Sequence, residues 1–193
     1  SAIYAQAIAE ELDVDPRSIT LIMGHTDETP EGGYSAGFLS AVTNHKKVAS
    51  LTRTALLGLA ATKLGAPAAN LTVANGVVSG GGKTVSYADL VRGQRLSLQI
   101  PVSGGLPQID PKDPIGINNL GGISVAGNPP VKPLAEYKVV GAEFDRPGIR
   151  NIVMGKAQYS GDVTVPGMLH ARMVRPATIG SRLIEAGTLD RAR

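Results

Sequence analysis

A long stretch rich in glycine and proline, from Gly93 to Pro133, most limits what this chain of 193 residues can fold into. Its larger part reads PVSGGLPQIDPKDPIGINNLGGISVAGNPPVKP and has no sustained apolar period. Irregular stretches of this length are uncommon inside compact domains and usually link or cover something. We therefore predict an α+β unit over residues 1–92, a linker over 93–133, and a strand-rich unit over 134–193.

The N-terminal unit begins with helical and strand patterns in turn. Residues 2–12 have helical spacing, and Pro16 marks the break that follows. The run SITLIMG, residues 18–24, is β-branched and predicts a buried strand closed by glycine. Residues 41–65 predict a long helix that stops at Gly65. Its core face is predicted to hold Val48, Leu51, Ala55, Leu59 and Ala60.

A hairpin signal follows this helix. Asn75-Gly76 separates two short β-prone runs, and this dipeptide is typical of two-residue hairpin turns. A second, glycine-rich turn leads to another short strand and a turn of helix before Gly93.

Beyond the linker the pattern changes to strands. The runs YKVVG, GKAQYSGDV, GMLHARMVRP and SRLIEA are each bounded by turn residues. In the third run the side chains alternate, which predicts one face formed by Leu169, Ala171 and Met173 and the other formed by His170, Arg172 and Val174.

Composition excludes several classes of protein. The 19 basic and 16 acidic residues leave a net charge of only +3, and the densest basic cluster is Lys46-Lys47, so we expect no nucleic-acid partner. No apolar run is long enough to span a bilayer, and we expect no membrane span. The absence of cysteine excludes disulfides, thiolate metal sites and cysteine-ligated iron–sulfur clusters within this chain.

Both ends of the chain lie in patterned sequence. SAIYAQAIAEEL starts directly in a helical pattern, and LIEAGTLDRAR stops on an arginine. We expect this chain to be a piece of a longer protein. Its compartment, bacterial cytoplasm or periplasm, stays open because any export signal would lie upstream.

Few residues suggest catalysis or metal binding. His25, His45 and His170 lie in different expected elements without a clustered carboxylate, so we assign no metal site. Asp27 and Glu28 precede a proline, where carboxylates usually serve turns. No arrangement of serine, histidine and aspartate is forced together, and we assign no catalytic residue.

The stretch TPEGGYSAGFLSAV, residues 29–42, allows two interpretations. Gly33 can adopt positive φ, and small residues at Ser35, Ala36 and Gly37 would leave room for a ligand at the start of a helix, where free N–H groups favour anions. Alternatively it is a turn in which Ser40 or Thr43 caps the helix. The residues alone favour the turn, since a single glycine-rich loop is a weak signal.

Two longer motifs extend this comparison to a family. QAIAEELDVDPRSITLIMGHTDETPEGGYSAG resembles the molybdenum-cofactor-binding large subunits of the xanthine dehydrogenase/aldehyde oxidase family, especially those similar to the isoquinoline 1-oxidoreductase beta chain. EYKVVG followed by GKAQYSGDVTVPGMLHARMVRP is similar to the start of that family's α/β-hammerhead domain. The resemblance implies part of a molybdopterin-binding domain over 1–92 and the beginning of a hammerhead domain over 134–193.

The resemblance also implies a function, a cofactor and partners. Such enzymes hydroxylate N-heterocycles or aldehydes at molybdopterin and pass electrons to an iron–sulfur small subunit, and this chain would be inactive without the remainder of the large subunit or a companion chain. Matching positions make Ser35, Ala36, Gly37 and Ser40 candidate cofactor contacts, with backbone groups of Gly33 and Tyr34 beside them.

Three departures from the family pattern leave an alternative open. Phe38 stands where relatives usually have a small hydroxyl residue, NHKKV replaces a run that usually contains glycine, and His25 replaces a common aspartate. The family's catalytic glutamate also has no match in this chain. The alternative is a non-catalytic structural or interaction protein that kept the fold and lost the cofactor site.

Overall fold

The computed structural model describes residues 2–22, 27–29, 38–104, 124–173, 175–176 and 178–182. The chain forms two compact units, Ser1–Ile149 and Arg150–Arg193. Within the described ranges, no helix combines the length and apolar character that crossing a membrane requires.

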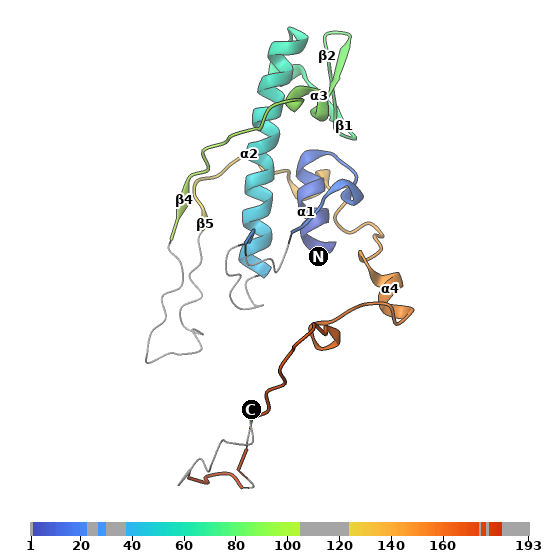
Figure 1. Ribbon diagram of the computed structural model, residues 1–193. Coiled ribbons are helices and arrows are strands. Elements are labelled where there is room, and N and C mark those ends of the chain that lie inside the picture. The colour runs from blue at the N-terminus through green and yellow to red at the C-terminus, as the bar shows by residue number, and fades with distance from the viewer. Residues whose placement is uncertain are drawn as a thin grey trace. The chain divides into compact units, whose positions relative to one another are not determined.

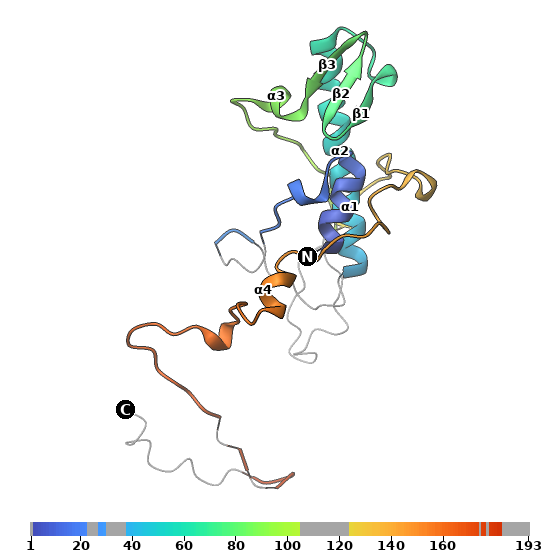
Figure 2. The same ribbon diagram turned by 90° about the vertical axis from the view of Figure 1, so that its right-hand side faces the viewer.

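Two helices, α1 (Ala2–Leu12) and α2 (Phe38–Leu64), lie side by side and form the centre of the first unit (Figures 1 and 2). The small residues Ala5, Ala7 and Ala9 of α1 are all buried. Ala5 and Ala9, about one turn apart, lie on one face of the helix, and Ala7 lies on the other side, so α1 is covered on more than one face. Asp13, with a φ of 54°, ends α1 by taking the left-handed conformation. Both predicted helices are confirmed.

The buried face of α2 differs from the predicted one. Ala49, Leu56, Ala60 and Leu64 are buried, whereas Leu59 is 38% exposed. Of the five residues predicted to face the core, only Ala60 is buried. The side of α2 that contacts the rest of the unit is a different one from the side that carries the most apolar residues in the sequence. Apolar residues also occur on the solvent side of helices, and composition alone does not say which stripe is covered.

The hairpin prediction is confirmed. Strands β1 (Thr72–Ala74), β2 (Val77–Gly80) and β3 (Lys83–Ser86) form an antiparallel sheet in that order. Asn75-Gly76 and Gly81-Gly82 make the two tight turns, and all four residues have positive φ, as type I′ turns require. Helix α3 (Tyr87–Val91) follows, capped by Ser86.

The sheet, α3 and the C-terminal half of α2 share one apolar core (Figure 2). The buried side chains of this core come from all three parts, so that each covers an apolar face of the others. They are Leu56, Ala60, Leu64, Val78, Val85 and Leu90.

Two glycines give opposite expectations for the same change to alanine. Gly76 has a φ of 72°, and a Cβ there would lie 3.3 Å from Cγ1 of Val14, so we expect Gly76→Ala to destabilise by about 1–2 kcal/mol. Gly58 lies inside α2 with open space around it, so we expect Gly58→Ala to stabilise by about 0.5–1 kcal/mol. Denaturant unfolding of the full-length protein measures the change in unfolding free energy for both variants. Changes of the same sign would contradict the turn assigned at Gly76.

The strand predicted over residues 18–24 is wrong in its described part. Residues 19–22 are irregular, and Ile22 is 56% exposed. A strand needs a neighbour for its backbone groups, and the described residues supply no ladder partner here. Residues 23–24 lie outside the described part of the chain.

The described part of the predicted linker is mostly irregular but closely attached to the helices. Strands β4 (Val102–Ser103) and β5 (Ser124–Val125) pair antiparallel at its two sides. Residues 124–142, here called the strap, then run along α2 and α1 and include the 3₁₀ turn Leu134–Glu136 (Figures 1 and 2). The division of the chain at residue 133 stays a prediction; the first compact unit extends to Ile149.

The second unit contains little regular structure among its described residues. Helix α4 (Ile149–Val153) and the 3₁₀ turn Ser160–Asp162 are its described elements. The strands predicted over 155–163 and 167–176 are absent from the described positions, as is the strand predicted over 137–141 in the first unit. No described residue pairs with these runs, and Leu169 and Met173 are 93% and 78% exposed.

Candidate functional site

The residues predicted to contact a cofactor lie mainly outside the described part of the chain. This applies to Gly33, Tyr34, Ser35, Ala36 and Gly37. Ser40 lies in the first turn of α2, and its side chain is also outside the description. The role of these residues therefore stays a prediction.

The start of α2 corrects one of the two interpretations of the glycine-rich stretch. The helix begins at Phe38, so Ser40 and Thr43 are inside it and neither is its N-cap. The first turn contains no acidic residue, and its leading N–H groups have no acceptor within the helix. The positive end of the helix dipole is thus not neutralised by a carboxylate of its own first turn, which fits an anionic group placed there.

One histidine close to this helix start is committed to packing. The ring of His45 stacks on Tyr4 of α1 with centroids 4.8 Å apart, and its Nδ1 lies 2.6 Å from the carbonyl oxygen of Ala41. His170 is exposed in the second unit, and His25 lies outside the described residues. Over the described ranges, no three side chains of His, Asp or Glu gather as metal ligands would.

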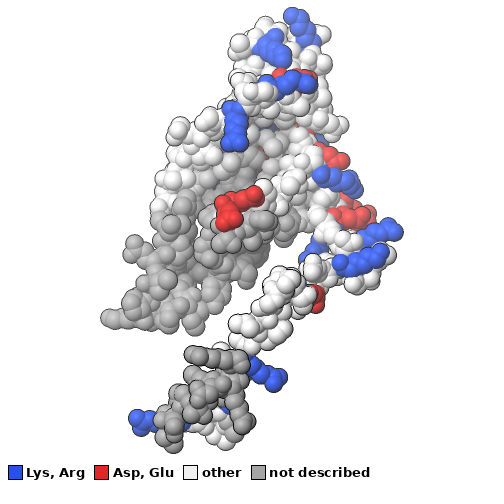
Figure 3. All heavy atoms as spheres, in the orientation of Figure 1, with Lys and Arg blue, Asp and Glu red and all other residues white. Residues whose placement is uncertain are grey.

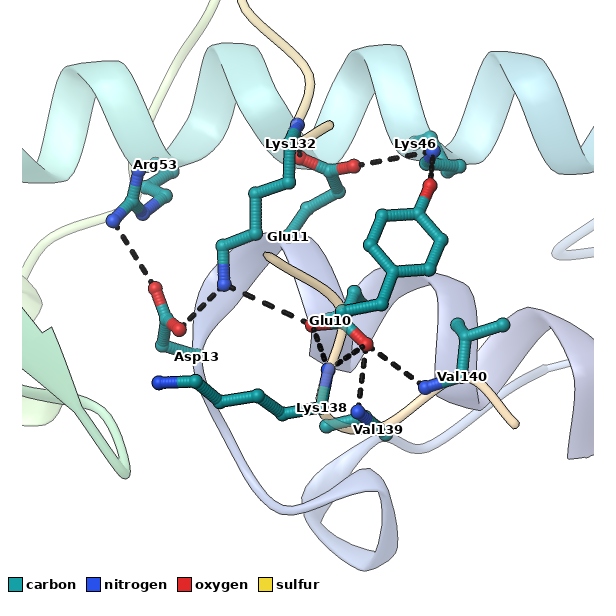
Figure 4. Close-up of polar contacts among 10 residues, drawn as sticks. Glu10, Glu11, Asp13, Lys46, Arg53, Lys132, Lys138, Val139 and Val140 are labelled. Atoms are coloured by element: carbon teal, nitrogen blue, oxygen red, sulfur yellow. Dashed lines mark hydrogen bonds and ion pairs between the residues drawn. The ribbon is translucent and has the colours of Figure 1, made fainter. Parts of the chain in front are cut away.

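Sequence reasoning missed a buried cluster of charges between the helices and the strap (Figure 4). Its carboxylates are at the end of α1, its cations come from α2 and the strap, and Glu10 and Glu11 are each only 1% exposed. The members of this acid–base cluster are Glu10, Glu11, Asp13, Lys46, Arg53 and Lys132.

Glu10 binds the backbone of the strap. Its carboxylate accepts hydrogen bonds from the backbone N–H groups of Lys138, Val139 and Val140, at 2.7 Å for Val139 and 2.8 Å for Val140 (Figure 4). Burial alone would raise the pKa of Glu10, but these hydrogen bonds and the charge of Lys132 lower it below its ordinary value. Glu10 is therefore an ionised anchor at neutral pH.

Lys132 brings all three carboxylates together. Its ammonium group lies 2.5 Å from Asp13 and 3.9 Å from Glu10, and its backbone N–H donates to Glu11 at 3.0 Å. Arg53 pairs with the other oxygen of Asp13 at 3.1 Å. Lys46 pairs with Glu11 at 3.5 Å and donates to the hydroxyl of Tyr137. Three acids and three bases balance, as buried charges require.

A buried phenol lies next to this cluster. Burial raises the pKa of Tyr87 to about 12, with the charge of Arg53 opposing this and that of Asp13 adding to it. Tyr87 thus stays protonated at neutral pH. The contacts of the acid–base cluster join α1, α2 and the strap to one another, which is a structural role.

The attachment of the strap should depend on pH in one direction. Because the pKa of Glu10 is lowered on folding, its contribution is complete above its unfolded pKa of about 4.3 and is lost as pH falls through the lowered value. We expect the amides of Val139 and Val140 to keep the same protection through neutral pH and to lose it only in acid. Hydrogen exchange of the full-length protein, corrected for intrinsic rates, measures this, and loss of protection near pH 6 would contradict the assignment.

A small cavity of about 200 Å³ lies between α2 and the strap. Lys47 borders it, and its ammonium group donates to the carbonyl oxygens of Val125 at 2.9 Å and Gly127 at 3.0 Å. The cavity is lined by Thr43, Lys46, Lys47, Asn128, Pro129 and Val131.

The charges on one face of the molecule are dispersed rather than concentrated. On the face shown in Figure 3, the described Lys and Arg side chains stand apart along the chain, several of them beside Asp or Glu. Exposed pairs such as Arg92–Asp89, at 2.6 Å, are local contacts within a turn.

Comparison with known proteins gives these features a context. The sequence model of the molybdopterin cofactor-binding domain matches residues 1–107, which take in α1, α2, the three-stranded sheet and α3. One of the subunits of the nicotinate dehydrogenase of Pseudomonas putida is 30% identical over 180 residues, which are 91% of this chain and 13% of that protein. A membrane-bound aldehyde dehydrogenase (pyrroloquinoline-quinone) of Gluconacetobacter polyoxogenes is 28% identical over 182 residues, 90% of this chain and 20% of that protein. The chain thus spans a fifth or less of these relatives.

Proposed function

Because this chain belongs to the family of molybdopterin cofactor-binding domains, we propose that it is part of the large subunit of a molybdenum hydroxylase. The observation that carries this proposal is the match over residues 1–107, which includes the glycine-rich loop, the helix that follows it and the sheet. The similarity to part of a nicotinate dehydrogenase over 91% of the chain supports the same assignment beyond residue 107.

The proposed reaction is the oxidative hydroxylation of an N-heterocycle or an aldehyde. Both substrate classes are named among the relatives, as nicotinate for one and aldehyde for the other. When bound, the molybdenum cofactor would supply the oxygen-transfer and redox chemistry that no side chain of this protein provides. The chain contributes binding and orientation, and we assign no catalytic residue in it.

The cofactor-binding role falls to the loop that leads into α2. We propose that backbone groups of Gly33 and Tyr34 and the small residues Ser35, Ala36, Gly37 and Ser40 approach the cofactor. Two features support this. The small side chains permit close approach of a ligand to the backbone, and the first turn of α2 has no carboxylate that would repel a phosphate.

The alternative of a non-catalytic protein that lost the cofactor site is not favoured. The family match and both relatives lead to cofactor-binding or dehydrogenase proteins. Phe38 is the first residue of α2. A change of side chain at this position leaves in place the backbone N–H groups that a ligand at the helix start would use.

The remaining parts of the proposal concern domains and partners. We propose that residues 93–133 link the cofactor domain to the beginning of an α/β-hammerhead domain over 134–193. We also propose that the remainder of the large subunit and an iron–sulfur small subunit complete the enzyme. The nicotinate dehydrogenase relative is itself one of several subunits and is much longer than this chain, which supports the need for companions.

Substrate oxidation by the complete enzyme tests the function. The full-length large subunit, purified with its companion and cofactor, is given a pyridine carboxylate or an aldehyde with an artificial electron acceptor in isotope-labelled water. We expect one substrate class to be oxidised and the product to carry oxygen from water. Oxidation with oxygen from another source, or no oxidation of either class by cofactor-loaded protein, would refute the proposal.

A further inference from the structure

Lys47 differs from the other cations between the helices and the strap. Lys46, Arg53 and Lys132 each have a carboxylate within 4 Å, at 3.5, 3.1 and 2.5 Å respectively. Lys47 instead donates to two uncharged backbone oxygens, of Val125 and Gly127, and forms no ion pair with any described carboxylate. Within the described part of the chain, no carboxylate compensates its positive charge.

The geometry of this ammonium group leaves it one donor. A lysine ammonium has three N–H groups, and two of them are used by the carbonyl oxygens. Lys47 also borders the cavity beside α2, which Pro129 and Val131 make partly apolar. Charge-assisted hydrogen bonds are stronger in such surroundings than in open water.

The size of the cavity limits what it can hold. A volume of about 200 Å³ is smaller than the roughly 300–1,000 Å³ of pockets for whole drug-sized ligands. It suits a terminal group of a few heavy atoms. We propose that this cavity binds the anionic end, a phosphate or a carboxylate, of a small ligand, with Lys47 as its counter-ion.

The site adjoins the acid–base cluster and shares Lys46 with it. The charge of Lys46 is already balanced by Glu11, at 3.5 Å. An anion in the cavity would thus meet one positive charge that no described carboxylate matches, with Asn128 in the same lining. The cluster itself would remain neutral.

Binding of inorganic phosphate to the full-length protein tests the proposal by calorimetry. Lys47→Gln keeps a donor for the two carbonyl oxygens but removes the charge, and we expect it to weaken phosphate binding about tenfold. Lys47→Arg should retain binding. Lys63→Gln is the matched control, because Lys63 is on the same helix, also donates to a backbone carbonyl, at 3.2 Å, and should have no effect.

Two further titrations identify the source of the anion. Protein purified with and without molybdopterin is titrated in parallel, and acetate replaces phosphate in a second series. Phosphate binding only to cofactor-free protein means that the phosphate of the cofactor fills the cavity, whereas equal binding to both means an independent ligand. Unchanged binding by Lys47→Gln, or no anion binding to folded protein in either form, would overturn the proposal, and neither result bears on whether the protein holds molybdopterin.

Discussion

Replacing Glu10 with leucine is expected to destabilise the first unit by about 3–5 kcal/mol. The carboxylate is 1% exposed and accepts hydrogen bonds from three successive backbone N–H groups of the strap. Leucine has a similar size but would leave these donors buried without an acceptor and Lys132 with one carboxylate fewer. Native-state hydrogen exchange of the full-length protein should show the loss at the amides of Val139 and Val140.

Two variants separate this effect from a general loss of charge. Glu143→Gln changes an exposed carboxylate just after the strap and should alter stability by less than about 0.5 kcal/mol. Glu10→Gln keeps one acceptor oxygen, so its loss of stability should lie between the losses of Glu143→Gln and Glu10→Leu. If Glu10→Leu left the protection of the strap amides unchanged, the anchoring role of Glu10 would be refuted.

The second large effect is expected in the apolar core. Leu56→Ala should destabilise by about 3 kcal/mol, because Leu56 is buried among Val78, Val85 and Leu90 and its removal leaves a cavity. Urea unfolding of the full-length protein, followed at the first transition, measures the change.

Leu59→Ala provides the matched control on the same helix. Leu59 is 38% exposed, so the same truncation should cost less than about 1 kcal/mol. The ratio of the two losses in unfolding free energy tests which face of α2 is buried. A loss at Leu59 that equals or exceeds the loss at Leu56 would contradict the observed burial of this helix.

Local patterns predicted the helices and the hairpin well. The two type I′ turns need positive φ at both central residues, and Asn75-Gly76 and Gly81-Gly82 supply residues that tolerate it. The long helix ends where Gly65, with a φ of 68°, takes the left-handed conformation. In each case the information lies within a few neighbouring residues.

Long-range contacts were not predictable in the same way. Glu10, Glu11 and Asp13 looked like ordinary polar residues at a helix end, yet each of them also binds the strap, more than a hundred residues along the chain. A proline-rich sequence gave no sign that its backbone would be bound by α1. These contacts depend on the tertiary structure. A backbone N–H group can donate a hydrogen bond whatever its side chain is, so the sequence of the strap does not reveal that its backbone is bound.

The strand predictions failed where pairing decides the outcome. Alternation at Leu169, Ala171 and Met173 describes one face of a strand, but a strand is stable only with neighbours, and none of the residues described in this chain pairs with that run. Val102–Ser103 and Ser124–Val125 show the opposite case, since they pair although their surroundings suggested only an irregular connection.

The candidate cofactor loop was predicted from the resemblance of the sequence to a family and not from the chemistry of its own residues. The residues alone favoured a plain turn with Ser40 or Thr43 as the cap. The capping role is wrong because both residues lie inside α2, and the turn itself lies outside the described residues. The family match covers this stretch, and the role of its residues at the cofactor stays a proposal. The sequence marked Lys47 only as part of a short basic pair, because its contacts with the backbone oxygens of Val125 and Gly127 are visible only in three dimensions.

The most direct test of the central claim is the molybdopterin content of the full-length protein purified from cells that supply the cofactor. We expect the wild type to carry molybdopterin in proportion to protein. Gly37→Asp should lose most of it, because a carboxylate before the first turn of α2 would repel the phosphate. Gly37→Asn, of equal size, should lose less, and Gly58→Ala should lose none. A wild type without molybdopterin, or full cofactor content in Gly37→Asp, would contradict the account.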